Sequence, residues 1–598
     1  MAEDDKWARD SHPDYRVDGP PADLPEGHVT RTGFSYQLRF LWKALMRSPT
    51  RNVLFFTFLI IFVLICLIAF GQLAINSWMK NFWSAIEARD VGEFMRQLGI
   101  FLLIAGGLLV LNLIQTFLNQ YFKLKLREGL TNDLIGQWLQ PKRAYRLRLS
   151  GEIGVNPDQR LHEDARHLAE STADLAINLL QATITLFLFI HVLWLTSAGF
   201  VFNFHGRSFA LPGYMVWAVI LYAGSASFLT WLVGHRLVFL NADRYAKEAE
   251  LRAALMRVNQ SIEAVTLVSG ERAEKSLLAG KVDDVLAAIW KIVLAMTRLT
   301  GITAAYGWIS NIAPVVIAAP IYFGGGINLG GLMQAVNSFN QAHNSLRWFV
   351  DNYGALADWR ATMLRIATFR QALGAMDGVN KPQSGRIRIV TRREKQLMFN
   401  DFTIRTANGC ITIDPARTVI KRGQRVAVDC TRGVDGSILF QAMGGLWPWG
   451  SGKISFPAAD CIAYIPWRTY LPSAPLRDVL LYPACASTPD DTEITDLLNA
   501  AGLQHFTTML DRKADWDKIL GDSEKQCLAL VRAILQKVDF IILENVFNTL
   551  ENSTRLRMEK LIGNRLQHAA IVNLAGRHSK NAFFTREIKA RFHTGLSE

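Results

Sequence analysis

Long apolar runs are the feature of this sequence that most limits its fold. Val53 to Trp78 is apolar over more than the roughly 20 residues that a helix needs to cross a bilayer. Further candidate spans are Leu98–Tyr121, Leu175–Leu195, Leu211–Val233 and Ile302–Phe323, with Leu332–Val350 a weaker sixth. The sequence therefore predicts an α-helical polytopic membrane domain of six spans, preceded by an amphipathic interfacial helix over Phe34–Met46.

Composition divides the chain into parts of different character. Its 598 residues are too many for one core, and the apolar residues are concentrated before about residue 350. We expect a disordered cytoplasmic tail over 1–32, a membrane domain over 33–375, a linker over 376–395 and a water-soluble domain over 396–598. The tail lacks the apolar stretch of a cleaved signal peptide.

Basic residues set the predicted orientation. The formal net charge is +13, but much of the excess lies in loops between apolar runs, which indicates membrane topology and not nucleic-acid binding. The loop after the second span carries Lys123, Lys125, Arg127, Lys142, Arg143, Arg146 and Arg148. Because such loops resist translocation, this loop and both termini are expected in the cytoplasm. Six single cysteines without metal-type spacing indicate reduced thiols and no metal site.

Two spans carry polar stripes at helical spacing. The third has His167, Asp174, Asn178, Gln181 and Thr185 on one face, and the sixth has Asn337, Asn340, Asn344, Arg347 and Asp351. Ionisable groups inside a membrane normally face a bundle interior or a water-filled path, so these stripes are the candidate solute pathway. The alternative is that they only form hydrogen bonds between helices, and both interpretations stay open.

The C-terminal part has the pattern of an α/β nucleotide-binding core. From about residue 396, β-patterned runs such as Phe402–Arg405, Gln424–Asp429 and Cys461–Ile465 alternate with helical ones. A phosphate-binding loop should follow a strand in such a core, and residues 423–442 occupy that place.

Three segments carry a resemblance to a known family. Gly444–Ile454, GGLWPWGSGKI, resembles the AGLWPWGSG-type sequence of bacterial ABC half-transporters of the YddA type, relatives of the SbmA/BacA peptide transporters and of the subfamily D exporters. Asn156–Arg160 with Glu163 and Asp164 resembles their first intracellular loop. Glu250–Arg252, Asn259, Glu263 and Gly270–Glu271 resemble the second. The resemblance runs from about residue 35 to the end and implies a P-loop-type nucleotide-binding domain after the membrane domain.

Laid on that family's pattern, the nucleotide site departs almost everywhere. Where the family has Gly-x-x-Gly-x-Gly-Lys-Ser, this chain has Cys430, Gly433, Asp435, Gly436 and Ser437, without the lysine. Asp435 would place a carboxylate in a loop built for anions. The other replaced positions are Trp467 for the magnesium-sensing glutamine, Leu520–Glu524 with Ser523 for the signature, Glu544 for the metal-associated aspartate, Asn545 for the general-base glutamate and Gly576 for the switch histidine, with His578 two residues on.

These replacements predict a degenerate cassette without catalytic residues. An ABC site is composite, so a chain altered in both the phosphate loop and the signature weakens both sites of a dimer. Gly433, Ser437 and Glu544 form the vestigial site, and ATP and Mg²⁺ binding is expected to be weak or absent. We therefore expect no effective ATP hydrolysis.

A different energy source is then needed, and the SbmA/BacA resemblance implies the proton gradient. Glu170, Asp174, Asp351 and Asp358 are the candidate proton carriers if burial perturbs them. The alternative is that they pair with Arg166, Arg347 or Arg360 and never change charge. Both interpretations stay open.

Taken with the family resemblance, the chain is expected to be an inner-membrane transporter working as a homodimer or with a related half-transporter. It would move peptide-like, cobalamin-like or other amphipathic solutes, without nucleic acid as a partner. Two alternatives remain. One is an ATP-hydrolysing ABC transporter, and the other is a non-transporting regulatory or assembly subunit.

Overall fold

The computed structural model describes residues 46, 49–149, 157–197, 201–204, 207–376, 385–392, 396–406, 408–430, 434–457, 462–483, 489–575 and 583–594. The predicted tail, and the predicted interfacial helix apart from Met46, lie outside the described residues. The chain forms two compact units, each described by itself. One contains residues 31–136 and 156–369, and the other contains 137–155 and 370–598.

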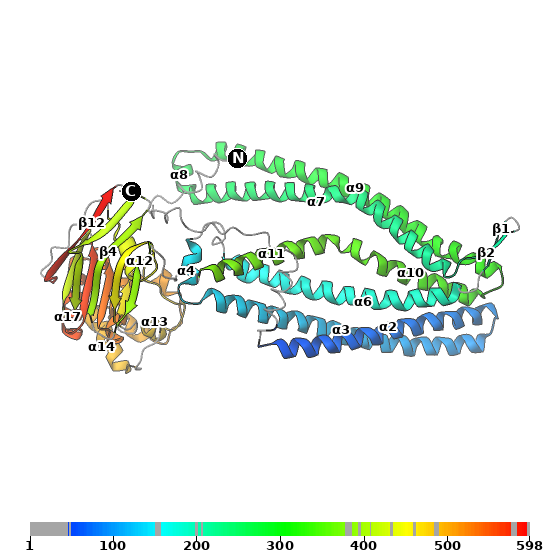
Figure 1. The fold of residues 1–598 in the computed structure, drawn as a ribbon, viewed down its shortest axis with the longest axis horizontal. Helices are drawn as coiled ribbons and strands as arrows, with labels where there is room; N and C mark the ends of the chain where they lie inside the picture. Colours follow the sequence, from blue (N-terminus) through cyan, green and yellow to red (C-terminus); the bar gives the residue numbers. More distant parts are fainter. Residues whose placement is uncertain are drawn as a thin grey trace. The chain divides into compact units, whose positions relative to one another are not determined.

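The first unit is built from long helices (Figure 1). They are α2 (Arg51–Glu87), α3 (Val91–Trp138), α6 (Ala165–Ser197), α7 (Tyr214–Gln260), α9 (Glu271–Phe323), α10 (Leu329–Asp351) and α11 (Tyr353–Ala375). The short elements between them are α5 (Pro157–Gln159), the π-helical turn η3 (Arg160–Asp164), the hairpin strands β1 (Val201–Phe204) and β2 (Arg207–Ala210), and α8 (Ile262–Leu267).

Four helices of the described part are long and apolar enough to cross a membrane, and they contain the first, second, third and fifth expected spans. The fourth expected span lies in α7, where the apolar residues that the structure describes are Tyr214–Phe228. The weaker sixth lies in α10, which falls below this hydropathy because its polar stripe interrupts the apolar residues. A helical membrane-type domain is therefore confirmed, with four candidate spans among the described residues, and the count of six stays a prediction.

Apolar packing holds α6, α7, α9 and α10 together. Phe189 of α6, Val219 of α7, Ala318 of α9 and Phe339 of α10 belong to one buried cluster. Other large apolar side chains point outward, and Leu103 of α3 remains 78% exposed. In a water-soluble protein such a surface would be costly, but in a bilayer it meets lipid chains. Beyond this cluster α7 and α9 continue side by side as a pair (Figure 1).

The second unit contains a mixed sheet. Its strands are β3 (Arg388–Thr391), β4 (Gln396–Thr406), β5 (Gly409–Asp414), β6 (Arg417–Lys421), β7 (Arg425–Cys430), β8 (Gly450–Phe456), β9 (Ile462–Ile465), β10 (Phe540–Glu544), β11 (Ala570–Ala575) and β12 (Arg586–Thr594). The order is β3-β8-β4-β5-β12-β7-β11-β10-β9, and β6 pairs with β4. The strands β7, β11, β10 and β9 are mutually parallel, so their carboxyl ends share one edge.

Helices cover both faces of this sheet. They are α12 (Gly436–Met443), α13 (Leu476–Leu481), α14 (Asp491–Ala501), α15 (Trp516–Ile519), α16 (Asp522–Leu535) and α17 (Asn552–Arg565), with the 3₁₀ turns η6 (Gln504–Met509) and η7 (Val546–Thr549). Phe540 and Ile542 pack in the cluster that includes α12, whereas Ile541 and Leu543 pack in the cluster of α13, α14, α16 and α17. This alternation is what a strand buried on both faces requires.

The turn α4 (Arg143–Arg148) belongs to the second unit. Leu149, which follows it, packs against the α12 side of the sheet. The Arg146 guanidinium is buried and donates to the carbonyl of Met376 at 3.3 Å. The end of the basic segment after the second predicted span, Arg143–Arg148, thus packs within the second unit, whereas Lys123, Lys125 and Arg127 lie in α3.

Candidate nucleotide site and solute pathway

The helix that follows β7 begins on a carboxylate. Asp435 is the N-cap residue of α12, and its Oδ1 accepts the backbone N–H of Ser437 at 2.8 Å. The first amides of a helix are unpaired donors and carry partial positive charge, which is why they attract phosphate. Here the protein's own acid uses one of these donors and adds negative charge beside the others.

The Cys430 thiol, which lies beside this turn, is also affected by nearby carboxylates. Burial raises the pKa of the Cys430 thiol to about 12, and the carboxylates of Asp429 and Asp435 add to the rise. A phosphate site has the opposite character, since it stabilises anions. Two carboxylates, those of Asp429 and Asp435, therefore act on the end of β7.

This surrounding predicts slow alkylation of Cys430. With a pKa near 12, about one thiol in 10⁴ is ionised at pH 8, and that fraction rises tenfold per pH unit until the pKa is reached. Asp435→Asn keeps a capping oxygen, removes the charge, and should lower the pKa and speed alkylation. Mass spectrometry of iodoacetamide-treated protein between pH 7 and 10 measures the rate. A fast reaction at pH 7, unchanged in the variant, would contradict this prediction.

The end of β10 carries Glu544 and Asn545, which are engaged within the protein. Glu544 is 7% exposed, and its Oε2 lies 3.5 Å from the backbone nitrogen of Trp467. The Trp467 carbonyl accepts from the side-chain amide of Gln526. Asn545 has a left-handed backbone, with φ at 54°, and its Oδ1 accepts from Asn548 Nδ2 at 2.6 Å. The positions predicted for metal and water activation thus hold a buried acid and an amide.

The segment predicted as the signature lies at the start of α16, where an acidic side chain of the same segment accepts a backbone N–H. Glu524 of α16 accepts the Gly521 N–H at 2.9 Å through Oε2, and its Oε1 lies 3.1 Å from His505 Nε2. Ser523 is half-buried in the first turn. His505 was not among the predicted site residues, and no sequence pattern links it to a position 19 residues away. Of the remaining predicted residues, Gly433, Gly576 and His578 lie outside the described residues.

Some residues in the polar stripe of α6 contact neighbouring helices, and others are exposed on the surface. Asp174 forms an ion pair with Lys123 of α3 at 2.7 Å, and Gln181 accepts from Gln115 of α3 at 3.4 Å. Asn178 between them is exposed, whereas Thr185 is buried. Toward the start of the helix, His167 Nε2 lies 3.2 Å from Asp358 of α11. The stripe therefore lies partly against α3 and α11 and partly on the surface of this subunit.

The stripe of α10 contains a buried hydrogen-bonded cluster. Asn76 of α2 is fully buried, donates to Ser338 Oγ at 2.9 Å and accepts from Asn337 Nδ2 at 2.8 Å. Asn340 is half-buried and Asn344 is exposed. Asn76 was not predicted, although a lone asparagine in an apolar run was a usable signal. Asn337 therefore connects α10 to α2, whereas Asn344 is placed to meet solvent or solute.

This difference gives a matched pair of variants. Asn337→Ala should lower the stability of the helical unit by about 1 kcal/mol, because it breaks an interhelical hydrogen bond. Asn344→Ala should leave the melting temperature unchanged because the side chain is exposed. Thermal unfolding of detergent-solubilised protein compares them. Equal melting temperatures for the two variants would show that the Asn337 bond is not stabilising.

Each predicted proton carrier lies beside a lysine, arginine or histidine side chain. Glu170 pairs with Arg166 at 2.9 Å, and Asp351 pairs with Arg347 at 3.1 Å. Asp174 and Asp358 have Lys123 and His167, as described above. These contacts favour the interpretation in which the carboxylates pair with other side chains.

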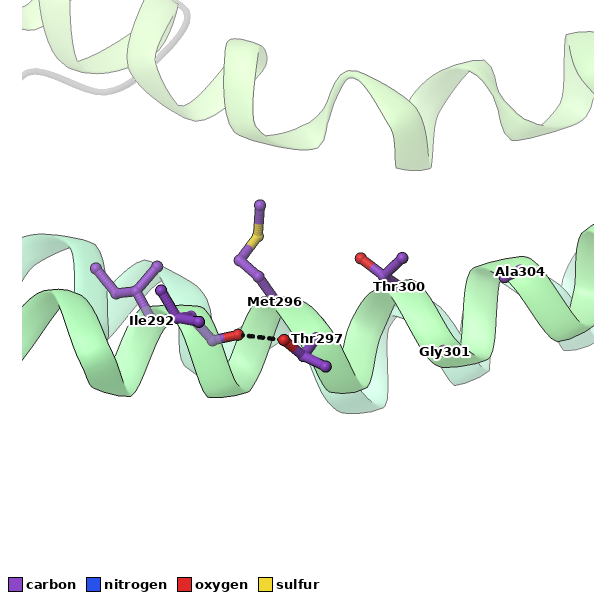
Figure 2. Close-up of a pocket in the computed structure, with 7 residues that line it drawn as sticks. Ile292, Met296, Thr297, Thr300, Gly301 and Ala304 are labelled. Atoms are coloured by element: carbon purple, nitrogen blue, oxygen red, sulfur yellow. Dashed lines mark hydrogen bonds between the residues drawn. The ribbon is translucent and has the colours of Figure 1, made fainter.

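An apolar hollow of about 680 Å³ lies along α9. Figure 2 shows Ile292, Met296, Thr300 and Ala304 on its wall, with the Thr297 hydroxyl donating to the Val293 carbonyl at 2.8 Å. The residues that line it come from this one helix, and the predicted polar stripes lie on other helices.

Comparison with known proteins finds a family model that matches most of the helical part. Residues 41–323 match the family described as ABC transporter transmembrane region 2. This segment is therefore similar to ABC transporter transmembrane regions. It spans α2 to α9, and so includes the four candidate spans.

Similar proteins extend over most of the chain. The inner membrane ABC transporter ATP-binding protein YddA of Escherichia coli is 25% identical over 84% of this chain and 88% of its own length. The chloroplastic ABC transporter D family member 2 of Arabidopsis thaliana is 22% identical over 96% of this chain and 89% of its own length. Human ATP-binding cassette sub-family D member 3 is 23% identical over 81% of this chain and 77% of its own length. The similarity to YddA-type and subfamily D proteins is thereby confirmed.

Proposed function

We propose that this chain is one half of a dimeric inner-membrane transporter whose cassette does not hydrolyse ATP. The supporting observation is the contact between Asp435 Oδ1 and the Ser437 amide at the start of α12. A carboxylate there competes with phosphate for the same donors and repels it. The cassette then serves as a dimerisation or regulatory scaffold.

The energy for transport in this proposal comes from the proton gradient. Both helix starts predicted to hold nucleotide, α12 and α16, carry an internal acid, Asp435 and Glu524. A partner copy would bring the same two acids, so pairing cannot restore the missing cationic groups. The cargo is an amphipathic solute, for which labelled amphipathic peptides and cobalamin are suitable probes.

Uptake into sealed proteoliposomes tests this proposal. With an imposed pH gradient, a labelled probe should accumulate, the accumulation should collapse with an uncoupler, and vanadate should have no effect. In the same assay, uptake that is unchanged in Asp174→Asn would show that Asp174 is not part of the proposed solute pathway. Vanadate-sensitive uptake that requires ATP would favour the ATP-driven alternative. Absence of uptake for every probe in the panel would favour a regulatory or assembly subunit.

A further inference from the structure

One buried titratable side chain of the helical unit has no role in the site described so far. His343 of α10 is 3% exposed, and its Nε2 has no hydrogen-bond partner among the described residues. Buried polar nitrogens are normally paired, so an unpaired one calls for an explanation. The carboxylates considered above differ, because each already lies against a basic or titratable partner.

We infer that His343 binds the proton that is coupled to solute movement, an inference that rests on the proposed proton-driven transport. A proton added at Nε2 in this conformation would be a buried charge without an acceptor. The protonated ring is therefore stable only after α10 has moved and given Nε2 water or a carboxylate. Protonation thus favours a second conformation over the one observed.

The groups around His343 are few and come from several helices. On α10 itself Arg347 lies one turn away and Asp351 two turns away, and both act electrostatically on the ring. From α7 comes Tyr222, whose ring centroid is 5.0 Å from that of His343, and Tyr306 of α9 packs on Tyr222 at 5.6 Å. The α6 side chains of the apolar cluster that includes Phe339 of α10 are Leu186, Phe189, Ile190 and Leu193. From α2, uncharged Asn76 contacts α10 further along.

Tyr222 connects the histidine to the α7–α9 pair. Its hydroxyl donates to the Tyr306 carbonyl at 3.3 Å, and the Tyr306 hydroxyl donates to Ser225 Oγ at 2.9 Å. Movement of the His343 ring would displace Tyr222, with which it is in ring contact. A change at His343 would therefore reach both helices of the pair through contacts that already exist.

The test uses the full-length protein in proteoliposomes with the peptide probe that wild type accumulates. For one proton per solute and one pH unit, accumulation is limited to about tenfold. His343→Gln should lose this accumulation and its pH dependence, yet keep counterflow exchange of the probe at equal pH. His191→Gln is the matched control, because His191 is an exposed histidine of α6. It should behave as wild type.

The outcomes separate this inference from the proposed function. If wild-type uptake ignores the uncoupler, the proposed function itself fails. If wild type is coupled and His343→Gln keeps both accumulation and pH profile, the role of His343 is wrong. Loss of counterflow in both His343→Gln and His343→Asn would show a packing role and would also overturn it. Retained counterflow with lost accumulation supports it.

Discussion

ATP hydrolysis by the purified protein is expected to stay below about 10⁻² s⁻¹, against about 1–10³ s⁻¹ for typical enzymes. In the proposed function the phosphate-loop lysine and the general base are replaced, and the Ser437 amide already donates to Asp435. Loss of a single group that stabilises the transition state commonly costs about 10²–10³ in rate. Release of inorganic phosphate from Mg-ATP by detergent-solubilised protein measures the rate.

Ser437→Ala is the control for this measurement. Because the hydroxyl of Ser437 supports no turnover in this account, the variant should match wild type within error. Turnover of several per second that Ser437→Ala abolishes would identify a working phosphate loop. The ATP-driven alternative would then be correct.

Asp164→Ala should destabilise the helical unit by about 3 kcal/mol, the largest stability effect that we expect. Asp164 is 4% exposed, lies in the π-helical turn before α6, and accepts from Arg160 at 2.6 Å and from Arg365 of α11 at 2.9 Å. Removal of the acid would leave two cations facing each other without a counter-charge. The expected loss is at the lower end of the range of about 3–5 kcal/mol for breaking a buried ion pair, because Arg365 is 40% exposed.

Glu163→Ala is the matched control for Asp164, since it removes an acid from the adjacent position of the same turn. Its pair with Arg166 is exposed, and exposed pairs contribute little. Thermal unfolding in detergent should therefore show a large drop for Asp164→Ala and almost none for Glu163→Ala. Equal drops would mean that the buried ion pair is not what holds α11 to this turn.

Much of the architecture follows from local patterns in the sequence. The strand expected over Gln424–Asp429 is β7, and the run before Ile465 is β9, because alternating or continuous apolar residues bounded by turn residues determine strands locally. Asp435 was predicted to place a carboxylate in the phosphate loop, and in the structure that carboxylate accepts the Ser437 N–H at the start of α12. The apolar runs likewise predicted where the four candidate spans lie, and α10, the weaker sixth, is less apolar than these helices.

The contacts that give polar residues their roles could not be predicted in the same way. Lys123 meets Asp174 across 51 positions, and Asn76 meets Ser338 across 262. Such pairings depend on which helix faces pack together, and helical periodicity within one segment does not contain that information. His343 is a further example. Its spacing on α10 is ordinary, and only packing against Tyr222 shows that it is enclosed.

The central claim is that solute moves without cleavage of ATP. Its most direct test counts phosphate released and probe accumulated in the same sealed proteoliposomes, loaded on the cassette side with Mg-ATP and exposed to a pH gradient. The account predicts that the probe accumulates while phosphate release stays at the level of protein-free vesicles. Phosphate release in fixed proportion to the probe moved, persisting after the uncoupler removes the gradient, would contradict it.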